Sequence, residues 1–138
     1  MQLNPMLNFN GQCKAAFEFY EQCFGGKMQT MMTWGQSPMA DQVPAEWRDR
    51  IIHASLSVGP TALLGGDAPP DRYEAPQGFA VTIQIDDPAA AERVFATLAE
   101  AGTVTMPIQE TFWAARFGMC TDRFGIPWMV NCGRPEVT

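Results

Sequence analysis

The chain has 138 residues, of which 46% are hydrophobic and 17% charged, and these proportions are typical of a folded globular domain. Its net charge of −6 at pH 7, without a cluster of Lys or Arg, argues against nucleic-acid binding because that affinity depends on neutralising phosphates. No run of 18 apolar residues and no signal-like N-terminal segment is present, so we expect no membrane association and a cytoplasmic location.

The four cysteines show no CxxC spacing, which disfavours a zinc site or a redox motif. We expect Cys13, Cys23, Cys120 and Cys132 to be reduced thiols in the core.

The first half of the chain begins with an alternation of apolar and polar residues over 3–9, which predicts a half-buried strand. Asn10 is expected to cap the helix that follows. Apolar residues recur in that helix at spacings of three and four, namely Cys13, Ala16, Phe17, Tyr20 and Phe24. Gly25-Gly26 would end it, and residues 27–34 would form a second strand.

Residues 35–50 are expected to be a surface excursion, with one short helical turn after Pro44. A hairpin follows, in which 53–58 and 61–64 are joined by a Gly-Pro turn. The Pro/Gly-rich stretch 66–78 has the composition of a linker.

The same order of elements recurs 76 positions later. Phe79, Val81, Ile83 and Ile85 repeat the strand alternation; Asp87 caps a helix that starts at Pro88 and that Gly102 ends. Strands are expected at 103–109, 115–121 and 127–132. The repeat predicts an α+β fold of two tandem βαβββ modules within a single domain spanning 1–138: module 1 at 1–66, a linker at 67–78 and module 2 at 79–138.

A sheet with a helix on one face must cover its other face, and we expect the two such faces to enclose a central cleft. Strand parity assigns these residues to the cleft: Asn4, Met6, Asn8, His53, Ser55, Ser57, Leu64, Ala80, Thr82, Gln84, Phe117, Met119, Met129 and Asn131.

Three segments carry a resemblance to a known family: LNFNGQCKAAFEFYEQCFGG at 7–26, IIHASLSVG at 51–59 and TFWAARFGMCTDRFGIPWMVN at 111–131. With the repeat, they resemble the vicinal oxygen chelate superfamily, which includes glyoxalases, bleomycin-resistance proteins and ring-cleaving dioxygenases, and within it the PhnB-like branch. Members of this branch are often labelled demethylubiquinone methyltransferases. The chain has no Gly-rich loop after a strand that would hold S-adenosylmethionine, so we do not expect that activity.

The resemblance also implies a divalent metal held by His and Glu at matched positions, two in each module. On this chain those positions fall near Asn4, Leu64, Ala80 and Met129. None offers the carboxylate or imidazole that such an ion prefers, so we expect no metal ligands and no cofactor of the usual kind.

Two residues are candidates for catalysis. His53, the only histidine, could act as a general base or could simply be a hydrogen-bonded residue at the start of a strand. Glu110, just before the loop Thr111-Phe112-Trp113, could bind a cation or join His53 at an unconventional metal, or could be a solvated loop acid.

The favoured hypothesis is a protein that binds an unknown small molecule in the cleft, like the resistance-type members, and that forms a homodimer, as superfamily members commonly do. We expect the ligand to contact Asn8, His53, Gln84, Trp113, Phe117, Met119 and Met129. The alternative is a metal-dependent isomerase, lyase or dioxygenase that uses His53 and Glu110.

Overall fold

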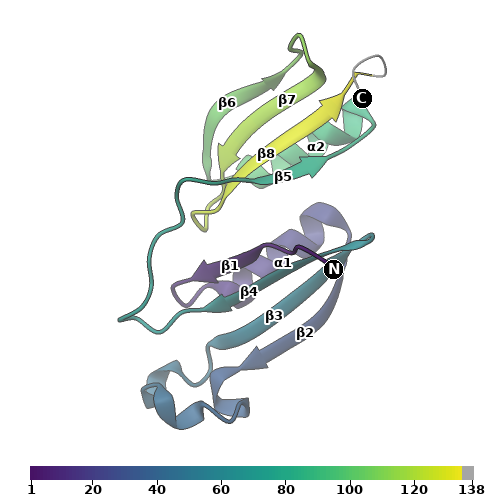
Figure 1. The fold of residues 1–138 in the computed structure, drawn as a ribbon. Helices are drawn as coiled ribbons and strands as arrows, with labels where there is room; N and C mark the ends of the chain where they lie inside the picture. Colours follow the sequence, from purple (N-terminus) through teal and green to yellow (C-terminus); the bar gives the residue numbers. More distant parts are fainter. Residues whose placement is uncertain (135–138) are drawn as a thin grey trace. The chain divides into compact units, whose positions relative to one another are not determined.

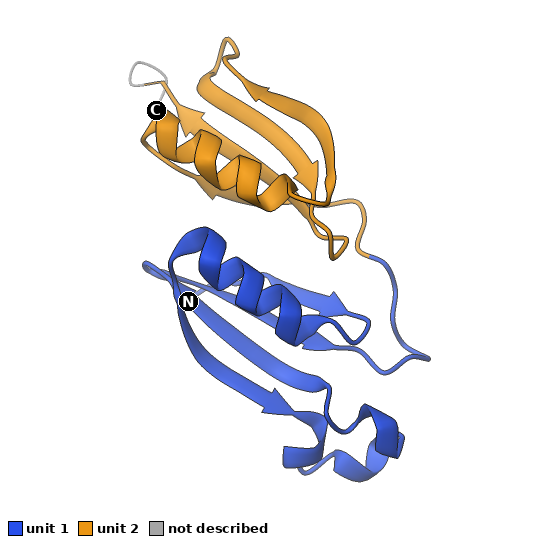
Figure 2. Ribbon diagram, turned by 180° about the vertical axis from the view of Figure 1, so that it is seen from behind, with its two compact units in different colours: residues 1–75 blue, residues 76–138 orange. Residues whose placement is uncertain are grey.

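The computed structural model describes residues 1–134 and divides into two compact units, residues 1–75 and 76–138 (Figure 2). Each unit contains one four-stranded sheet and one α-helix (Figure 1). The predicted α+β fold of two βαβββ modules is confirmed.

The first unit has the strand order β1-β4-β3-β2, in which β1 runs parallel to β4 and the other pairs are antiparallel. Its elements are β1 (Met6–Phe9), α1 (Cys13–Phe24), β2 (Lys27–Thr33), β3 (Ile51–Val58) and β4 (Thr61–Asp67). The last strand includes Asp67, one residue beyond the predicted module.

The second unit repeats this topology with the strand order β5-β8-β7-β6. Its elements are β5 (Val81–Gln84), α2 (Pro88–Ala99), β6 (Thr103–Gln109), β7 (Ala114–Thr121) and β8 (Pro127–Gly133). The parallel pair is β5 with β8, as β1 with β4 in the first unit, which is the arrangement expected of a duplicated module.

In each unit the helix packs across one face of its own sheet (Figure 2). In the first unit, Leu7 and Phe9 point from β1 toward α1 and are each 1% exposed. The rings of Phe9 and Phe17 meet edge to face, with centroids 6.2 Å apart, and Tyr20 packs beside them. Such aromatic pairs add to the stability gained by burying their area.

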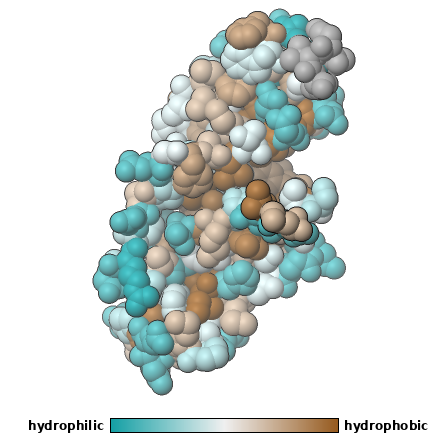
Figure 3. All heavy atoms as spheres, in the orientation of Figure 1, coloured by the Kyte–Doolittle hydropathy of each residue, from teal (hydrophilic) through white to brown (hydrophobic). Residues whose placement is uncertain are grey.

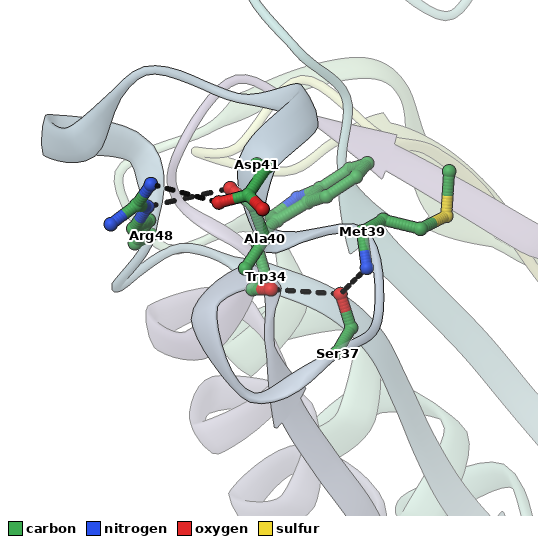
Figure 4. A network of polar contacts seen from close by, with 6 residues as sticks. All are labelled: Trp34, Ser37, Met39, Ala40, Asp41 and Arg48. Atoms are coloured by element: carbon green, nitrogen blue, oxygen red, sulfur yellow. Dashed lines mark hydrogen bonds and ion pairs between the residues drawn. The ribbon is translucent and has the colours of Figure 1, made fainter.

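The predicted surface excursion contains three short 3₁₀ turns: η1 (Trp34–Gln36), η2 (Ala40–Gln42) and η3 (Ala45–Trp47). Ser37 is buried in this segment. Its hydroxyl donates to the Trp34 carbonyl at 2.7 Å and accepts the Met39 amide at 3.1 Å (Figure 4). Arg48 closes the loop by an exposed ion pair with Asp41 (Figure 4).

The start of the first half differs from the prediction in two ways. Leu3 lies outside β1 and is 92% exposed, because the strand begins only at Met6. Asn10 does not cap α1: the N-cap residue is Gln12, and it makes no side-chain cap hydrogen bond. The helix does end as predicted at Gly25, which adopts the left-handed conformation with φ 68°.

The second helix starts as predicted and ends differently. Asp87 accepts a hydrogen bond from the Ala90 amide at 3.0 Å, with Pro88 at the first helical position. Gly102 was expected to end the helix, but the C-cap residue is Glu100, and the residue with positive φ after it is Ala101 (φ 60°). Gly102 is needed for a different reason, since a Cβ there would lie 2.3 Å from the Thr121 carbonyl oxygen.

None of the helices in residues 1–134 combines the length and the apolar character that crossing a bilayer requires. Cys13, Cys120 and Cys132 are buried free thiols, as expected, whereas Cys23 is only half-buried.

Candidate functional site

The helix-free face of the second unit carries two rows of side chains that run across its strands. The sheet is seen from this side in Figure 1, and the side chains of the same view are coloured by hydropathy in Figure 3. One row pairs Thr82 with Met129, Met129 with Met119, and Met119 with Met106. These three methionines are partly exposed, and the Thr82 hydroxyl donates to the Met129 sulfur at 3.6 Å. The row therefore offers flexible, polarizable thioethers at the surface of the sheet.

The neighbouring row combines amides with an aromatic ring. It pairs Gln84 with Asn131, Asn131 with Phe117, and Phe117 with Gln109. Asn131 Nδ2 donates to Gln84 Oε1 at 2.9 Å. Asn131 Oδ1 is buried and has no hydrogen-bond partner within residues 1–134. An unpaired buried acceptor costs free energy, so a hydrogen-bond donor at this position would be stabilising.

The loop between β6 and β7 adds aromatic rings to this face. Trp113 meets Phe117 edge to face with centroids 5.3 Å apart, and Phe112 meets Trp113 at 4.7 Å. The loop is a tight turn: the Thr111 amide donates to the Ala114 carbonyl at 3.0 Å, and the Ala114 amide donates to the Thr111 hydroxyl at 3.1 Å. Trp113 is therefore held in place beside the sheet.

Glu110 forms an ion pair with Arg134, at 2.9 Å between Oε2 and Nη2. Arg134 also donates through Nε and Nη2 to the Thr111 carbonyl. Together these contacts tie the start of the aromatic loop to the end of β8. The carboxylate of Glu110 thus has a cationic partner of its own.

The helix-free face of the first unit is different in chemistry. His53 is exposed on β3 opposite Met32, while Ser55 pairs with Leu64. Asn8 is exposed on β1 opposite Gly66. Parity therefore places Asn8 and His53 as the sequence predicts. They lie in the first unit, and the other predicted ligand contacts, Gln84, Trp113, Phe117, Met119 and Met129, lie in the second.

The positions that would hold the metal in related enzymes do not fit one. Leu64 and Met129 lie on β4 and β8, while Asn4 and Ala80 precede β1 and β5. No hard divalent ion would choose this donor set, which has neither carboxylate nor imidazole. Residues 1–134 also contain no group of three or more His, Cys, Asp or Glu side chains placed to hold a metal ion.

Sequence reasoning missed a buried carboxylate in the first unit. Asp67 is 3% exposed; its Oδ1 accepts the amides of Gly11 and Cys13 at 2.9 and 3.0 Å, and its Oδ2 accepts the Ile51 amide at 2.8 Å. It supplies the acceptor near the start of α1 that Asn10 was expected to provide. Its carbonyl also accepts the Trp34 indole N–H at 3.0 Å.

The second unit contains a similar carboxylate, also missed. Asp122 is 3% exposed; its Oδ1 accepts the amides of Phe124 and Ile126, and its Oδ2 accepts the Trp128 indole N–H at 2.8 Å. Asp67 is the last residue of β4, and Asp122 directly follows β7, so the signal available in the sequence was an acidic residue at the end of an apolar strand. All of these bonds stay within one unit, so both carboxylates are structural.

The chain matches a family model described as Glyoxalase/Bleomycin resistance protein/Dioxygenase superfamily over residues 2–130. It is 32% identical over 146 residues to Protein YjdN of Escherichia coli (strain K12), with 100% of this chain and 99% of that protein covered.

Solved structures show the same fold. The crystal structure of protein PA1353 from Pseudomonas aeruginosa is 48% identical, with a TM-score of 0.89 and coverage of 96% of this chain and 98% of that one. A putative 3-demethylubiquinone-9 3-methyltransferase, PhnB protein, from Bacillus cereus has a TM-score of 0.80 at 17% identity and covers 96% and 100%. The fosfomycin resistance protein FosX from Listeria monocytogenes has a TM-score of 0.65 at 9% identity and covers 99% and 95%. At such identities the last two show a shared fold alone.

Proposed function

Because the chain belongs to the Glyoxalase/Bleomycin resistance protein/Dioxygenase superfamily, we propose that it is a PhnB-like member that binds a small molecule without the superfamily's metal. The helix-free face of the second unit is the core of the proposed site. Asn8 and His53 of the first unit remain predicted contacts.

One observation carries this proposal. The exposed side of β5, β7 and β8 brings Gln84, Phe117 and Met129 into two adjacent rows, and Trp113 stands against Phe117. Ligand sites combine apolar and aromatic surface with a few placed polar groups, and this face has that composition. A face that served only as sheet surface would have no need of a buried and unpaired amide oxygen.

The donor chemistry supports a metal-free site. The four positions that the resemblance assigns to the metal offer an amide, a thioether and two hydrocarbon side chains. We therefore assign no step of a reaction to a metal ion. Binding alone accounts for the residues present.

A thermal-shift screen of neutral aromatic metabolites and antibiotics, followed by calorimetric titration of the hits, tests the proposal. We expect at least one compound to bind the wild-type protein and to lose about tenfold or more in affinity in Phe117→Ala, because the ring supplies much of the contact area. Arg93→Ala, at an exposed position of α2, is the control and should bind normally. Hits that bind Phe117→Ala as tightly as wild type would overturn the proposal.

Metal analysis of the purified protein, with titration of Ni, Mn and Zn, tests the metal-free part. We expect no stoichiometric uptake. Uptake abolished by His53→Ala would instead support the metal-dependent enzyme.

Light scattering of the same sample tests the predicted homodimer, for which a mass near 15.2 kDa would be the contrary result.

A further inference from the structure

We propose that the ligand is a neutral planar ring system carrying an O–H or N–H donor that hydrogen-bonds to Asn131 Oδ1. This inference rests on the proposed function and specifies the chemistry of what that site binds. Three properties of the second unit support it: the unpaired Asn131 oxygen, the adjacent rings of Trp113 and Phe117, and the absence of charge among the residues of the two rows.

The acceptor defines the polar group of the ligand. Asn131 Nδ2 is already engaged with Gln84 Oε1 at 2.9 Å, which fixes the orientation of the amide and leaves Oδ1 as its other polar atom. That oxygen is buried and has no partner within residues 1–134. A carboxamide oxygen accepts and does not donate, so the group that satisfies it must be a hydrogen-bond donor. A ligand bearing only carbonyl or ether oxygens would leave it unsatisfied.

The rings define the shape of the ligand. Phe117 is directly opposite Asn131 across the strands, and Trp113 meets Phe117 at 68° and 5.3 Å. An edge-to-face pair presents ring surfaces in two directions, against which a flat ring can stack. Met119 and Met129, one row away, supply flexible thioethers that adapt to the outline of such a ring.

The charge of the face defines the charge of the ligand. The two rows consist of Thr82, Met129, Met119, Met106, Gln84, Asn131, Phe117 and Gln109, and none of these side chains ionises. The nearby Glu110 is paired with Arg134 at 2.9 Å. A charged ligand would lose the hydration of its charge here without gaining a counter-charge. A neutral ligand avoids this desolvation penalty.

Matched probes test the inference: 2-naphthol, its methyl ether 2-methoxynaphthalene, and 2-naphthoate, titrated into the full chain by calorimetry. We expect 2-naphthol to bind about three- to tenfold more tightly than the ether, because one net hydrogen bond is lost. The carboxylate should bind more weakly than 2-naphthol. In Asn131→Leu the preference for naphthol over its ether should disappear, while in Asn131→Asp, which keeps an acceptor, the preference should remain.

The outcomes separate this inference from the proposed function. If the ether binds as tightly as 2-naphthol and both depend on Phe117, the donor requirement is wrong and the site stands. If no naphthalene binds but a non-planar compound binds in a Phe117-dependent way, the planar-ring inference is wrong. Asn131→Leu removes the Nδ2 bond to Gln84 as well as the unpaired oxygen, so Gln84→Leu, which removes that bond and keeps the oxygen, is its stability control. We expect Asn131→Leu to lower the melting temperature of the free protein no more than Gln84→Leu does, and a markedly larger drop would show that Oδ1 is satisfied within the protein and would overturn the inference.

Discussion

The two units have interiors that are built alike and helix-free faces that differ. Each has the same strand order and one buried aspartate that accepts two backbone amides on one oxygen and a third N–H on the other. Their helix-free faces diverge, with His53 and Ser55 in the first unit against Phe117 and Asn131 in the second. The comparison indicates that duplication retained what folds each sheet and left the helix-free faces free to specialise.

The strongest test of the shared interior is to remove each aspartate. Asp67→Ala removes the carboxylate that accepts three backbone amides, and Asp122→Ala removes the one that accepts two amides and the Trp128 indole. We expect each change to lower the free energy of unfolding by about 3–5 kcal/mol in urea denaturation.

Asp41→Ala serves as the control for that experiment. Its carboxylate is fully exposed and pairs with the exposed Arg48, so the loss should be small beside the loss in either buried variant. If Asp67→Ala or Asp122→Ala behaved like this control, the two carboxylates would not be equivalent supports of their units.

A second pair of substitutions tests how closely each helix approaches its sheet. A Cβ at Gly65 would lie 2.4 Å from the Phe17 ring, and one at Gly118 would lie 2.8 Å from the Phe95 ring. Both rings are buried, and at Gly118 the Ile108 Cα would also lie 3.0 Å away, so the clash must be relieved by moving packed elements. We expect Gly65→Ala and Gly118→Ala to cost about 1–3 kcal/mol each in the same denaturation assay, with Gly65→Ala the larger. Adding Phe17→Leu to Gly65→Ala should recover part of the lost free energy of unfolding. If none is recovered, the Phe17 ring is not the group that clashes.

The exposed faces could be predicted from sequence because strand alternation is local. The period of two alone placed Asn8, Gln84 and Met129 on the helix-free side. The buried aspartates could not be predicted in this way. Asp67 accepts from Gly11, which is 56 positions away, and it lies at the start of a Pro/Gly-rich stretch where an acid is usually solvated.

The same distance in sequence explains the error at the first helix. Asn10 has a cap-forming side chain at a suitable position, and that is all a local pattern can register. The fold brings Asp67 to the same amides and makes Asn10 unnecessary there. The unpaired state of Asn131 Oδ1 was equally inaccessible, because it depends on how the Gln84 amide is oriented across the sheet.

Alkaline pH tests one buried thiol in each unit, Cys13 in the first and Cys120 in the second. Burial first, and the charge of Asp122 second, raises the pKa of Cys120 to about 11; burial and then Asp67 raise the pKa of Cys13 further. Each thiol stays protonated in the folded state while it ionises in the unfolded chain, so stability should fall as pH rises from about 9 toward 11. We expect a loss of about 1–2 kcal/mol from each thiol over that range. Cys13→Ala and Cys120→Ala should each flatten the pH dependence in urea denaturation at pH 8 to 11, and an unchanged slope in both would contradict this account.

The smallest expected difference lies at the helix starts, where the units solve one problem in two ways. In the second unit the Asp87 side chain caps α2 by accepting the Ala90 amide, whereas in the first the N-cap Gln12 makes no such bond and Asp67 serves the nearby amides from β4. Asp87→Ala should therefore cost about 1 kcal/mol in urea denaturation, and Gln12→Ala should cost only a few tenths. An equal loss of about 1 kcal/mol at both positions would mean that Gln12 caps its helix, and the carboxylate of Asp67 would then lose its assigned role at α1.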